Sequence, residues 1–241
     1  MSLYVYCLGE DLGGAAFEGL AGVGGARVQL LKVGSLTALV SEAVDAAVNE
    51  SNLLAHNRVN AAALALTTPL PCRFGTRATP ERLDEYVSQN AAALEAALAR
   101  VRGRVEMSVK LMEKAKGKRQ KAKEEGETGV ADLKPAGAGT AFLLKKRREL
   151  LGEEGARRRA EEAAVWLASG VGELAQETAA RLSPSEAIFV RAAHLVERAR
   201  VEEYRRRLRT LAAARRDLRL LASGPWPPYS FSEVSGQNRP R

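Results

Sequence analysis

The chain has 241 residues, of which 46% are hydrophobic, 27% charged and 5% aromatic, and its formal net charge is +8. This balance is typical of a globular protein and excludes wholesale disorder and collagen-like or mucin-like chains. Residues 1–100 carry 7 Lys and Arg against 10 Asp and Glu, so their net charge is −3. Because the whole chain is +8, residues 101–241 have a net charge of +11. A basic half is compatible with nucleic acid, an acidic partner or a membrane surface, and does not choose among them.

Several classes of protein are disfavoured by simple absences in the sequence. Two cysteines, Cys7 and Cys72, are too few for a disulfide framework in a chain of this size. The first positively charged side chain is Arg27, so we expect no secretory signal. No apolar run approaches the roughly 18–20 residues that span a bilayer. We therefore expect a soluble cytoplasmic protein with reduced thiols.

The first part of the chain predicts a ferredoxin-like βαββαβ unit whose first helix is reduced. Alternating β-favouring residues indicate strands, and Gly34-Ser35 between two apolar runs is a hairpin signal. A cap at Ser51-Asn52 starts a helix, and Pro69 and Pro71 close it. The predicted elements, in chain order, are a strand over 3–8, a Gly-rich connection over 13–25, strands over 27–33 and 36–41, a helix over 51–66, and a short edge strand over 70–74.

A second helix is predicted over 79–102, where it connects two domains. Thr79-Pro80-Glu81 supplies a cap, a first-turn proline and an acidic residue in the favourable order, and the helical period runs to Gly103. The alternation that follows predicts a strand over 104–111. We expect an α+β protein with an N-terminal domain over 1–103 and a C-terminal domain over 104–241.

The C-terminal domain is predicted to be a modified ferredoxin-like unit. Residues 113–139 are rich in Lys, Glu, Gly and Pro and indicate a solvated low-complexity insertion. A long helix is expected over 140–182, because apolar and small residues step by four and three along it. A strand over 186–196, a helix over 199–214 and a strand over 217–222 follow. This order resembles a βαββαβ unit with one strand missing or irregular.

Sites for catalysis or cofactors are not indicated. The glycines from Gly19 to Gly25 lack the spacing of a phosphate loop, and no Gly-Lys-Ser/Thr occurs. His56 and His194 have no Cys, Asp or Glu at metal-ligand spacing, and no Gly-x-Ser-x-Gly is present, so a structural or surface role is expected for both. The basic clusters interleave with glutamates at helical offsets, which favours solvated helix faces. We expect no catalytic, cofactor-binding or metal-ligating residues, and no cofactor.

Two short motifs stand out as candidate partner-binding or structural elements. The first lies in Pro69–Thr76 and places a guanidinium beside an aromatic ring and a glycine: Arg73, Phe74 and Gly75. The second concentrates prolines and aromatics: Gly224, Pro225, Trp226, Pro227, Pro228, Tyr229 and Phe231. Such a stiff extended segment is either a strap tucked against a domain or an exposed anchor for another protein.

These motifs also carry a resemblance to a known family, the gas vesicle protein F/L (GvpF/GvpL) family. The resemblance runs nearly end to end. Its motifs are Leu3-Tyr-Val-Tyr6, Leu53-Leu-Ala-His-Asn-Arg58, Pro69-Leu-Pro-Cys-Arg-Phe-Gly-Thr76, Val105-Glu-Met-Ser-Val-Lys110, Gly139-Thr-Ala-Phe-Leu-Leu-Lys-Lys-Arg147, Glu186-Ala-Ile-Phe189 and Gly224-Pro-Trp-Pro-Pro-Tyr-Ser-Phe231. It implies two α+β domains, the second a modified ferredoxin fold with a variable insertion.

The resemblance also implies a role without catalysis. Family members are minor components of gas vesicles that contact the hydrophobic main shell protein and limit its aggregation during nucleation. The implied partners are that shell protein and other gas vesicle accessory proteins, with no nucleic acid and no membrane. The implied location is the gas vesicle, facing the gas in F-type members, and the cytoplasm during assembly. A nucleic-acid-binding protein is the alternative that the basic half leaves open; an enzyme rests on no positive feature.

Overall fold

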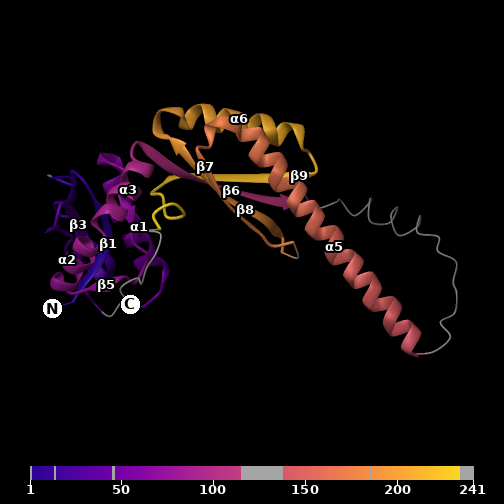
Figure 1. Ribbon diagram of the computed structural model, residues 1–241, viewed down its shortest axis with the longest axis horizontal. Helices are drawn as coiled ribbons and strands as arrows, with labels where there is room; N and C mark the ends of the chain where they lie inside the picture. Colours follow the sequence, from indigo (N-terminus) through magenta and orange to yellow (C-terminus); the bar gives the residue numbers. More distant parts are fainter. Residues whose placement is uncertain (1, 14, 45–46, 115–137, 185, 234–241) are drawn as a thin grey trace.

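The computed structural model describes residues 2–13, 15–44, 47–114, 138–184 and 186–233. These residues form two antiparallel sheets with helices packed against them (Figure 1). The expected α+β class is therefore confirmed. Within the described part of the chain, no helix is both long enough and apolar enough to cross a membrane.

The first sheet has the strand order β2-β3-β1-β4, and β5 also pairs with β1. Its strands are β1 (Leu3–Gly9), β2 (Gln29–Val33), β3 (Leu36–Glu42), β4 (Leu70–Pro71) and β5 (Arg77–Ala78). The predicted hairpin is present, and Gly34 has the positive φ of 53° that its turn requires. The predicted edge strand over 70–74 is shorter than expected, because the chain leaves the sheet after Pro71 and turns.

Three helices surround this sheet. They are α1 (Glu50–Leu66), α2 (Pro80–Gln89) and α3 (Ala91–Val101). The start of α2 is as predicted, since the Thr79 side chain accepts a hydrogen bond from the Arg82 amide. The cap of α1 is Asn49 rather than Ser51-Asn52, because the Asn49 side chain accepts from the Asn52 amide at 2.9 Å. The single helix predicted over 79–102 is interrupted at Asn90 and becomes two.

The second sheet has the strand order β7-β8-β6-β9. Its elements are β6 (Arg104–Glu113), α5 (Ala138–Val171), β7 (Glu177–Leu182), β8 (Ile188–Glu197), α6 (Val201–Ala214) and β9 (Leu218–Trp226). This is a complete βαββαβ order, and the strand expected to be missing or irregular is present as β7. The predicted helix over 140–182 ends at Val171, where Gly172 has a φ of 52°, and the remaining residues form β7. Most of the predicted insertion over 113–139, residues 115–137, lies outside the described residues.

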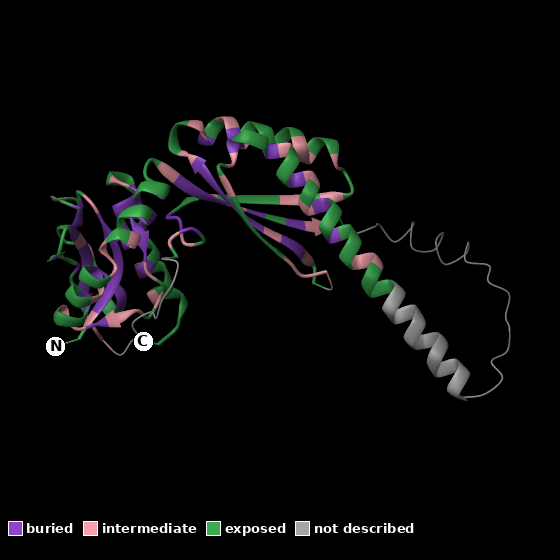
Figure 2. Cartoon of the chain, viewed as in Figure 1, coloured by how far each residue is buried: buried purple, intermediate pink, exposed green. Residues whose placement is uncertain are grey.

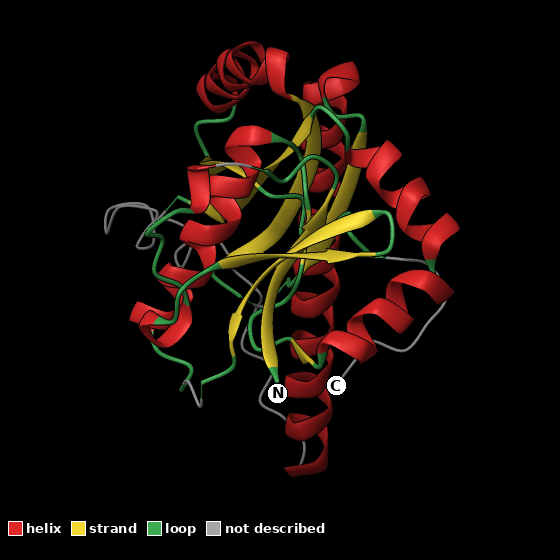
Figure 3. Cartoon of the chain, turned by 90° about the vertical axis from the view of Figure 1, so that its left-hand side faces the viewer, coloured by secondary structure: helices red, strands yellow, loops and turns green. Residues whose placement is uncertain are grey.

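Among the described residues, buried side chains form three apolar clusters, and strands carry many of these side chains (Figure 2). One cluster lies between the first sheet and α1, and another between the second sheet and its helices α5 and α6. The third joins α2, α3 and the first sheet to Ala193 and Leu195 of β8. Helices flank the strands on both sides when the molecule is viewed from its N-terminal end (Figure 3). The domain boundary at residue 103 stays a prediction, and an apolar core crosses it.

Candidate functional site

The motif over 224–231 begins as the end of β9. Gly224, Pro225 and Trp226 belong to this strand, and Trp226 pairs with Glu106 of β6. Gly224 has a φ of 119°, and a Cβ at this position would stand 2.8 Å from the Glu106 carbonyl oxygen, so the pairing requires glycine. After Trp226 the chain leaves the sheet and returns to the first half of the molecule. Residues 227–233 are called the strap below.

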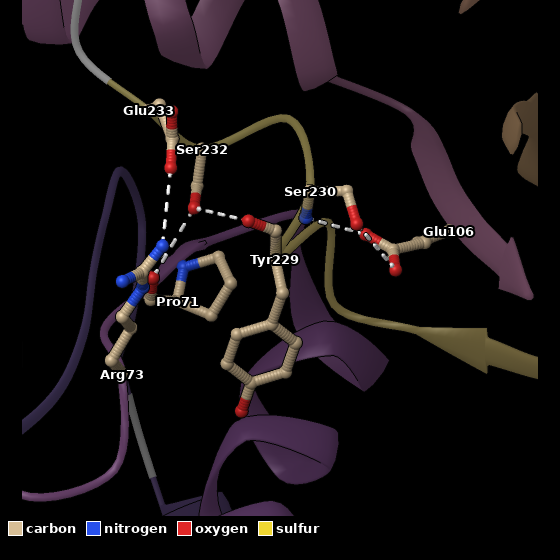
Figure 4. Close-up of polar contacts among 7 residues, drawn as sticks. All are labelled: Pro71, Arg73, Glu106, Tyr229, Ser230, Ser232 and Glu233. Carbon is tan, nitrogen blue, oxygen red and sulfur yellow. Dashed lines mark hydrogen bonds and ion pairs between the residues drawn. The ribbon is translucent and has the colours of Figure 1, made fainter. Parts of the chain in front are cut away.

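Polar side chains attach the strap to both sheets (Figure 4). The Glu106 carboxylate of β6 accepts hydrogen bonds from the Ser230 amide at 2.7 Å and from the Ser230 hydroxyl at 3.1 Å. The Ser232 hydroxyl donates to the Pro71 carbonyl oxygen of β4 at 3.4 Å. Glu106 is 8% exposed, and burial raises the pKa of its carboxyl against the opposite effect of the two Ser230 bonds. The strap therefore bridges the two sheets through a buried acceptor.

The aromatic end of the strap closes the junction between the two halves. Phe231 is 2% exposed and packs in the apolar cluster that also contains Val5, Leu94 and Leu195. The Arg100 guanidinium lies 5.9 Å from the centroid of its ring, a cation–π distance. Arg100 also donates to Glu177 of β7 at 2.7 Å, so Phe231 sits beneath an ion pair between α3 and the second sheet.

The first motif forms a loop over 72–76, between β4 and β5. Gly75 has a φ of 88°, a conformation that favours glycine, and its amide donates to the Tyr4 hydroxyl at 3.0 Å. The Tyr4 hydroxyl lies 3.0 Å from Nδ1 of His56 on α1. Burial lowers the pKa of His56 to about 4, so its ring is neutral, and the tautomer of the ring sets which atom donates in the Tyr4–Nδ1 hydrogen bond. This chain of bonds fixes the loop to β1 and α1.

Aromatic rings gather around His56 beneath this loop. Its ring centroid lies 5.8 Å from Tyr4, 5.6 Å from Tyr6, 5.7 Å from Phe74 and 6.3 Å from Tyr229. Phe74 comes from the first motif and Tyr229 from the second, so the two motifs meet at this histidine. His56 is 2% exposed, which is consistent with the structural role expected for it.

A cavity of about 840 Å³ lies between the 72–76 loop and the strap. This volume is in the range of binding pockets and can hold several side chains of a partner. Apolar residues of the first sheet, α2 and α3 line part of it, and polar side chains of the loop and strap line the rest. The lining residues include Val5, Leu8, Leu70, Leu83, Leu94, Arg73, Phe74, Gly75, Tyr229, Ser230, Ser232 and Glu233. At its rim, the exposed side chains of Arg73 and Glu233 pair at 3.3 Å.

The structure brings together part of the predicted set of residues. Arg73, Phe74, Gly75 and Tyr229 line the cavity. Pro227, Pro228 and Phe231 are buried as structural parts of the strap, whereas Trp226 is 42% exposed on β9 and is not a lining residue.

Sequence reasoning missed three residues that build this site: Tyr4, His56 and Glu106. The strand or helix that contains each of them was predicted correctly. Their burial was not, because it depends on segments that are distant in the sequence. Their partners Gly75 and Ser230 lie in the two candidate motifs. The three residues themselves lie in other stretches that carry the family resemblance, and that is the signal that could have pointed to them.

Glu106→Gln should lower the free energy of unfolding by about 1–2 kcal/mol, because the amide offers one acceptor oxygen to the two Ser230 donors. Urea unfolding at neutral pH measures this change. Glu113→Gln is the matched control on the same strand, since Glu113 is exposed and lies 3.4 Å from the exposed Arg159. Equal losses in the two variants would show that the strap contact contributes nothing to stability.

Comparison with known protein families places the chain among gas vesicle proteins. The family model described as "Gas vesicle synthesis protein GvpL/GvpF" matches residues 2–233. The chain therefore belongs to the GvpL/GvpF family, as the sequence motifs indicated.

Individual relatives agree with this assignment. The chain is 26% identical to gas vesicle protein L of Streptomyces sp. (strain CB03234), over 98% of this chain and 94% of that protein. It is similar to the crystal structure of gas vesicle protein GvpF from Anabaena sp. PCC7120, with a TM-score of 0.75, 21% identity and coverage of 99% and 98% of the two chains. GvpF from Microcystis aeruginosa gives a TM-score of 0.75 at 17% identity, with coverage of 97% and 99%. At these identities the two structures support the fold.

Proposed function

We propose that the protein assists gas vesicle assembly by binding the main shell protein and limiting its aggregation during nucleation. Membership of the GvpL/GvpF family supports a role connected with gas vesicles. The proposed role is non-catalytic, and the burial of both histidines, at 2% and 0% exposure, supports it. The proposed location is the growing vesicle, with a position facing the gas.

The observation that carries this proposal is the cavity between the 72–76 loop and the strap. A shell protein that lines a gas space has an apolar surface prone to self-association, so a helper needs an apolar contact and a charged exterior. Phe74 is half-buried at the wall of the cavity, and Trp226 is exposed at the end of β9, immediately before the strap. An aromatic contact region with a rim of charged side chains is a common arrangement of binding hot spots.

The charged exterior is provided by the helices of the second half. Arg157 and Arg158 of α5 pair with glutamates four residues further along, at 2.9 and 3.7 Å. Arg200 pairs with Glu203 at 2.9 Å beside the start of α6, three residues apart. The interleaved Arg and Glu residues thus form the solvated helix faces expected from their spacing. In the proposed role, these faces keep the complex with an apolar partner in solution.

Phe74→Ala and Trp226→Ala should each weaken binding of purified shell protein about tenfold, the effect expected when an aromatic contact is truncated. Co-sedimentation and pull-down of the full-length chain with shell protein measure the change. Val165→Ala is the matched control, because Val165 is 65% exposed on α5, away from the strap. Circular dichroism shows whether each variant is folded.

The same experiment tests where the contact lies. If both variants fold and retain all of the bound shell protein, the proposed contact at the cavity and strap is wrong. Leu54→Ala then identifies the next surface, since Leu54 is 54% exposed on the outer face of α1 beside Leu53. A loss in Leu54→Ala alone would move the contact to that helix and leave the proposed role standing.

A further inference from the structure

One face of the second sheet is covered only at one end within the described part of the chain, where Leu195 and Ala193 of β8 share an apolar cluster with α3 and Phe231. Helices α5 and α6 pack on the opposite face, where Val105, Met107, Val109 and Leu111 of β6 enter their apolar cluster (Figure 1). Because side chains alternate along a strand, Glu106, Ser108 and Lys110 project from the other face. This second face is called the open face below.

Three successive rows of side chains cross the open face from strand to strand. Residues that pair directly in antiparallel strands share a face, so the register defines each row. The first row is Glu177, Leu195, Glu106 and Trp226; the second is Ala179, Ala193, Ser108 and Ser223; the third is Arg181, Arg191, Lys110 and Leu221. Each row takes one residue from each of β7, β8, β6 and β9.

The third row places three cations directly opposite one another. Arg181 pairs in register with Arg191, and Arg191 with Lys110, so neighbouring backbones are about 5 Å apart. Like charges in this arrangement destabilise a sheet. One carboxylate offsets them: Glu186 lies 2.9 Å from Arg191, and the two arginines of the row lower its pKa, Arg191 more strongly. Lys110 is exposed and forms no ion pair within the described residues.

The second row forms a floor of small side chains between two rows of longer ones. Ala179 and Ser223 of this floor are exposed, Ser108 is half-buried and Ala193 is buried. On one side stand the cations, and on the other stand Trp226 and the contacts that hold the strap and α3 against the sheet, through Glu106 and Glu177. Rows on one face are two residues apart, so the first and third rows are separated by about 13 Å. An α-helix has a diameter of about 10–12 Å with its side chains, and it fits across this floor.

We propose that the open face binds an acidic amphipathic helix of a partner protein, lying across the strands. Carboxylates three and four residues apart on a helix are about 5–6 Å from one another, which matches the spacing of the cations from strand to strand. The partner's small or apolar side chains contact the floor of Ala and Ser residues. They also contact the exposed side chains of Trp226 and Leu221. Among the described residues, Trp226 is the one aromatic in these three rows, which favours a helix over stacked nucleotides.

This inference concerns a second partner, whose proposed contact shares Trp226 with the proposed shell contact, and it is tested without shell protein. Binding can be measured by fluorescence anisotropy with a labelled alanine-rich peptide of about 20 residues. The peptide carries glutamates at i, i+4 and i+7, and a matched peptide carries lysines at the same positions. The full-length chain should bind the glutamate peptide at about 50 mM salt, bind it more weakly as salt rises, and ignore the lysine peptide.

The Lys110→Glu/Arg181→Glu double variant should bind the glutamate peptide about tenfold more weakly and should gain binding to the lysine peptide. Arg209→Glu/Arg216→Glu is the matched control, because it makes the same charge change at exposed positions outside the open face. The double variant should also unfold at a higher temperature than the parent chain, since its new carboxylates face Arg191.

Three outcomes would overturn the proposal. The first is no binding of the glutamate peptide at low salt, and the second is an equal loss in the control double variant. The third is tighter binding of a single-stranded or duplex oligonucleotide with the same dependence on Lys110 and Arg181, which would make the open face a nucleic-acid surface. Shell protein binding should be unchanged in the Lys110→Glu/Arg181→Glu variant, so failure here and failure of the proposed assembly role can be told apart.

Discussion

Phe231→Ala is expected to lower the free energy of unfolding by about 3–5 kcal/mol, the range for truncating a buried phenylalanine. Phe231 is 2% exposed and packs against residues of both halves, among them Leu94 of α3 and Leu195 of β8. Its removal leaves a cavity at the junction and also takes away the ring beneath the Arg100 guanidinium. Urea unfolding followed by circular dichroism measures the loss.

Trp226→Ala is the control for this prediction, because it truncates an aromatic residue of the same motif that is 42% exposed. We expect a loss of no more than about 1 kcal/mol, since the exposed part of the ring gains little from folding. The difference between the two variants measures how strongly the strap holds the two sheets together. If Phe231→Ala lowered the free energy of unfolding no more than Trp226→Ala does, the strap would not stabilise the junction, and other contacts would hold the two sheets together.

The elements that could be predicted from the sequence are those with a local chemical cause. The hairpin between β2 and β3 follows from the positive φ that Gly34 allows, and the start of α2 follows from the Thr79 cap and Pro80. The strand β7 could not be predicted in this way. Its sequence, ETAARL, is rich in alanine and continues the period of the preceding helix. Pairing with β8 overrides that preference, and Gly172 is the local signal that marks the end of the helix.

The candidate site was predicted as two separate motifs, and their meeting is a property of the tertiary structure. Arg73, Phe74 and Gly75 were singled out for their residue types, as was the segment over 224–231. The cavity between them depends on β4, on the strap and on Tyr4 of β1, which are far apart in the sequence. Burial of His56 was not indicated either, because Asn57 and Arg58 beside it point to an exposed position.

The distribution of charge shows the same limit of local reasoning. Arg and Glu on α5 and α6 interleave along one segment, so their pairing follows from helical spacing. The row of Arg181, Arg191 and Lys110 takes its members from three strands, and their alignment depends on the register of the sheet. Two arrangements of charge in the second half thus have different origins: Arg and Glu that pair along a helix, and a row of cations that the sheet brings together.

Stability should fall as the pH is lowered from 6.5 to 4, because two buried histidines must remain neutral in the folded protein. Burial lowers the pKa of both His56 and His194 to about 4, whereas an unfolded chain titrates near 6.5. Between these values the unfolded chain binds more protons, so the free energy of unfolding decreases with falling pH. Each histidine contributes about 1.4 kcal/mol per pH unit, or roughly 3 kcal/mol across the window.

Carboxyl groups also change the dependence of stability on pH, some opposing the effect of the histidines and others adding to it. The raised pKa of Glu106 opposes the loss, because the folded protein then binds a proton more readily than the unfolded chain does. The ion-paired Glu177 and Asp217 have lowered pKa values, and they reduce stability further as the pH falls toward their folded values. The Asp217 side chain is 60% exposed and the Glu177 side chain 35% exposed, so solvent screening keeps their effect small beside that of the histidines.

The two histidines can be separated by their surroundings. His194 of β8 is 0% exposed and its Nδ1 contacts the Tyr204 hydroxyl of α6, whereas His56 supports the 72–76 loop through Tyr4. Urea unfolding from pH 7 to 4.5 should give a slope that His56→Gln reduces by about half. Proton NMR of the ring C–H resonances should show both rings unprotonated at pH 5.5 in the folded chain. A flat stability profile, or a ring that titrates near 6.5, would contradict the role assigned to burial.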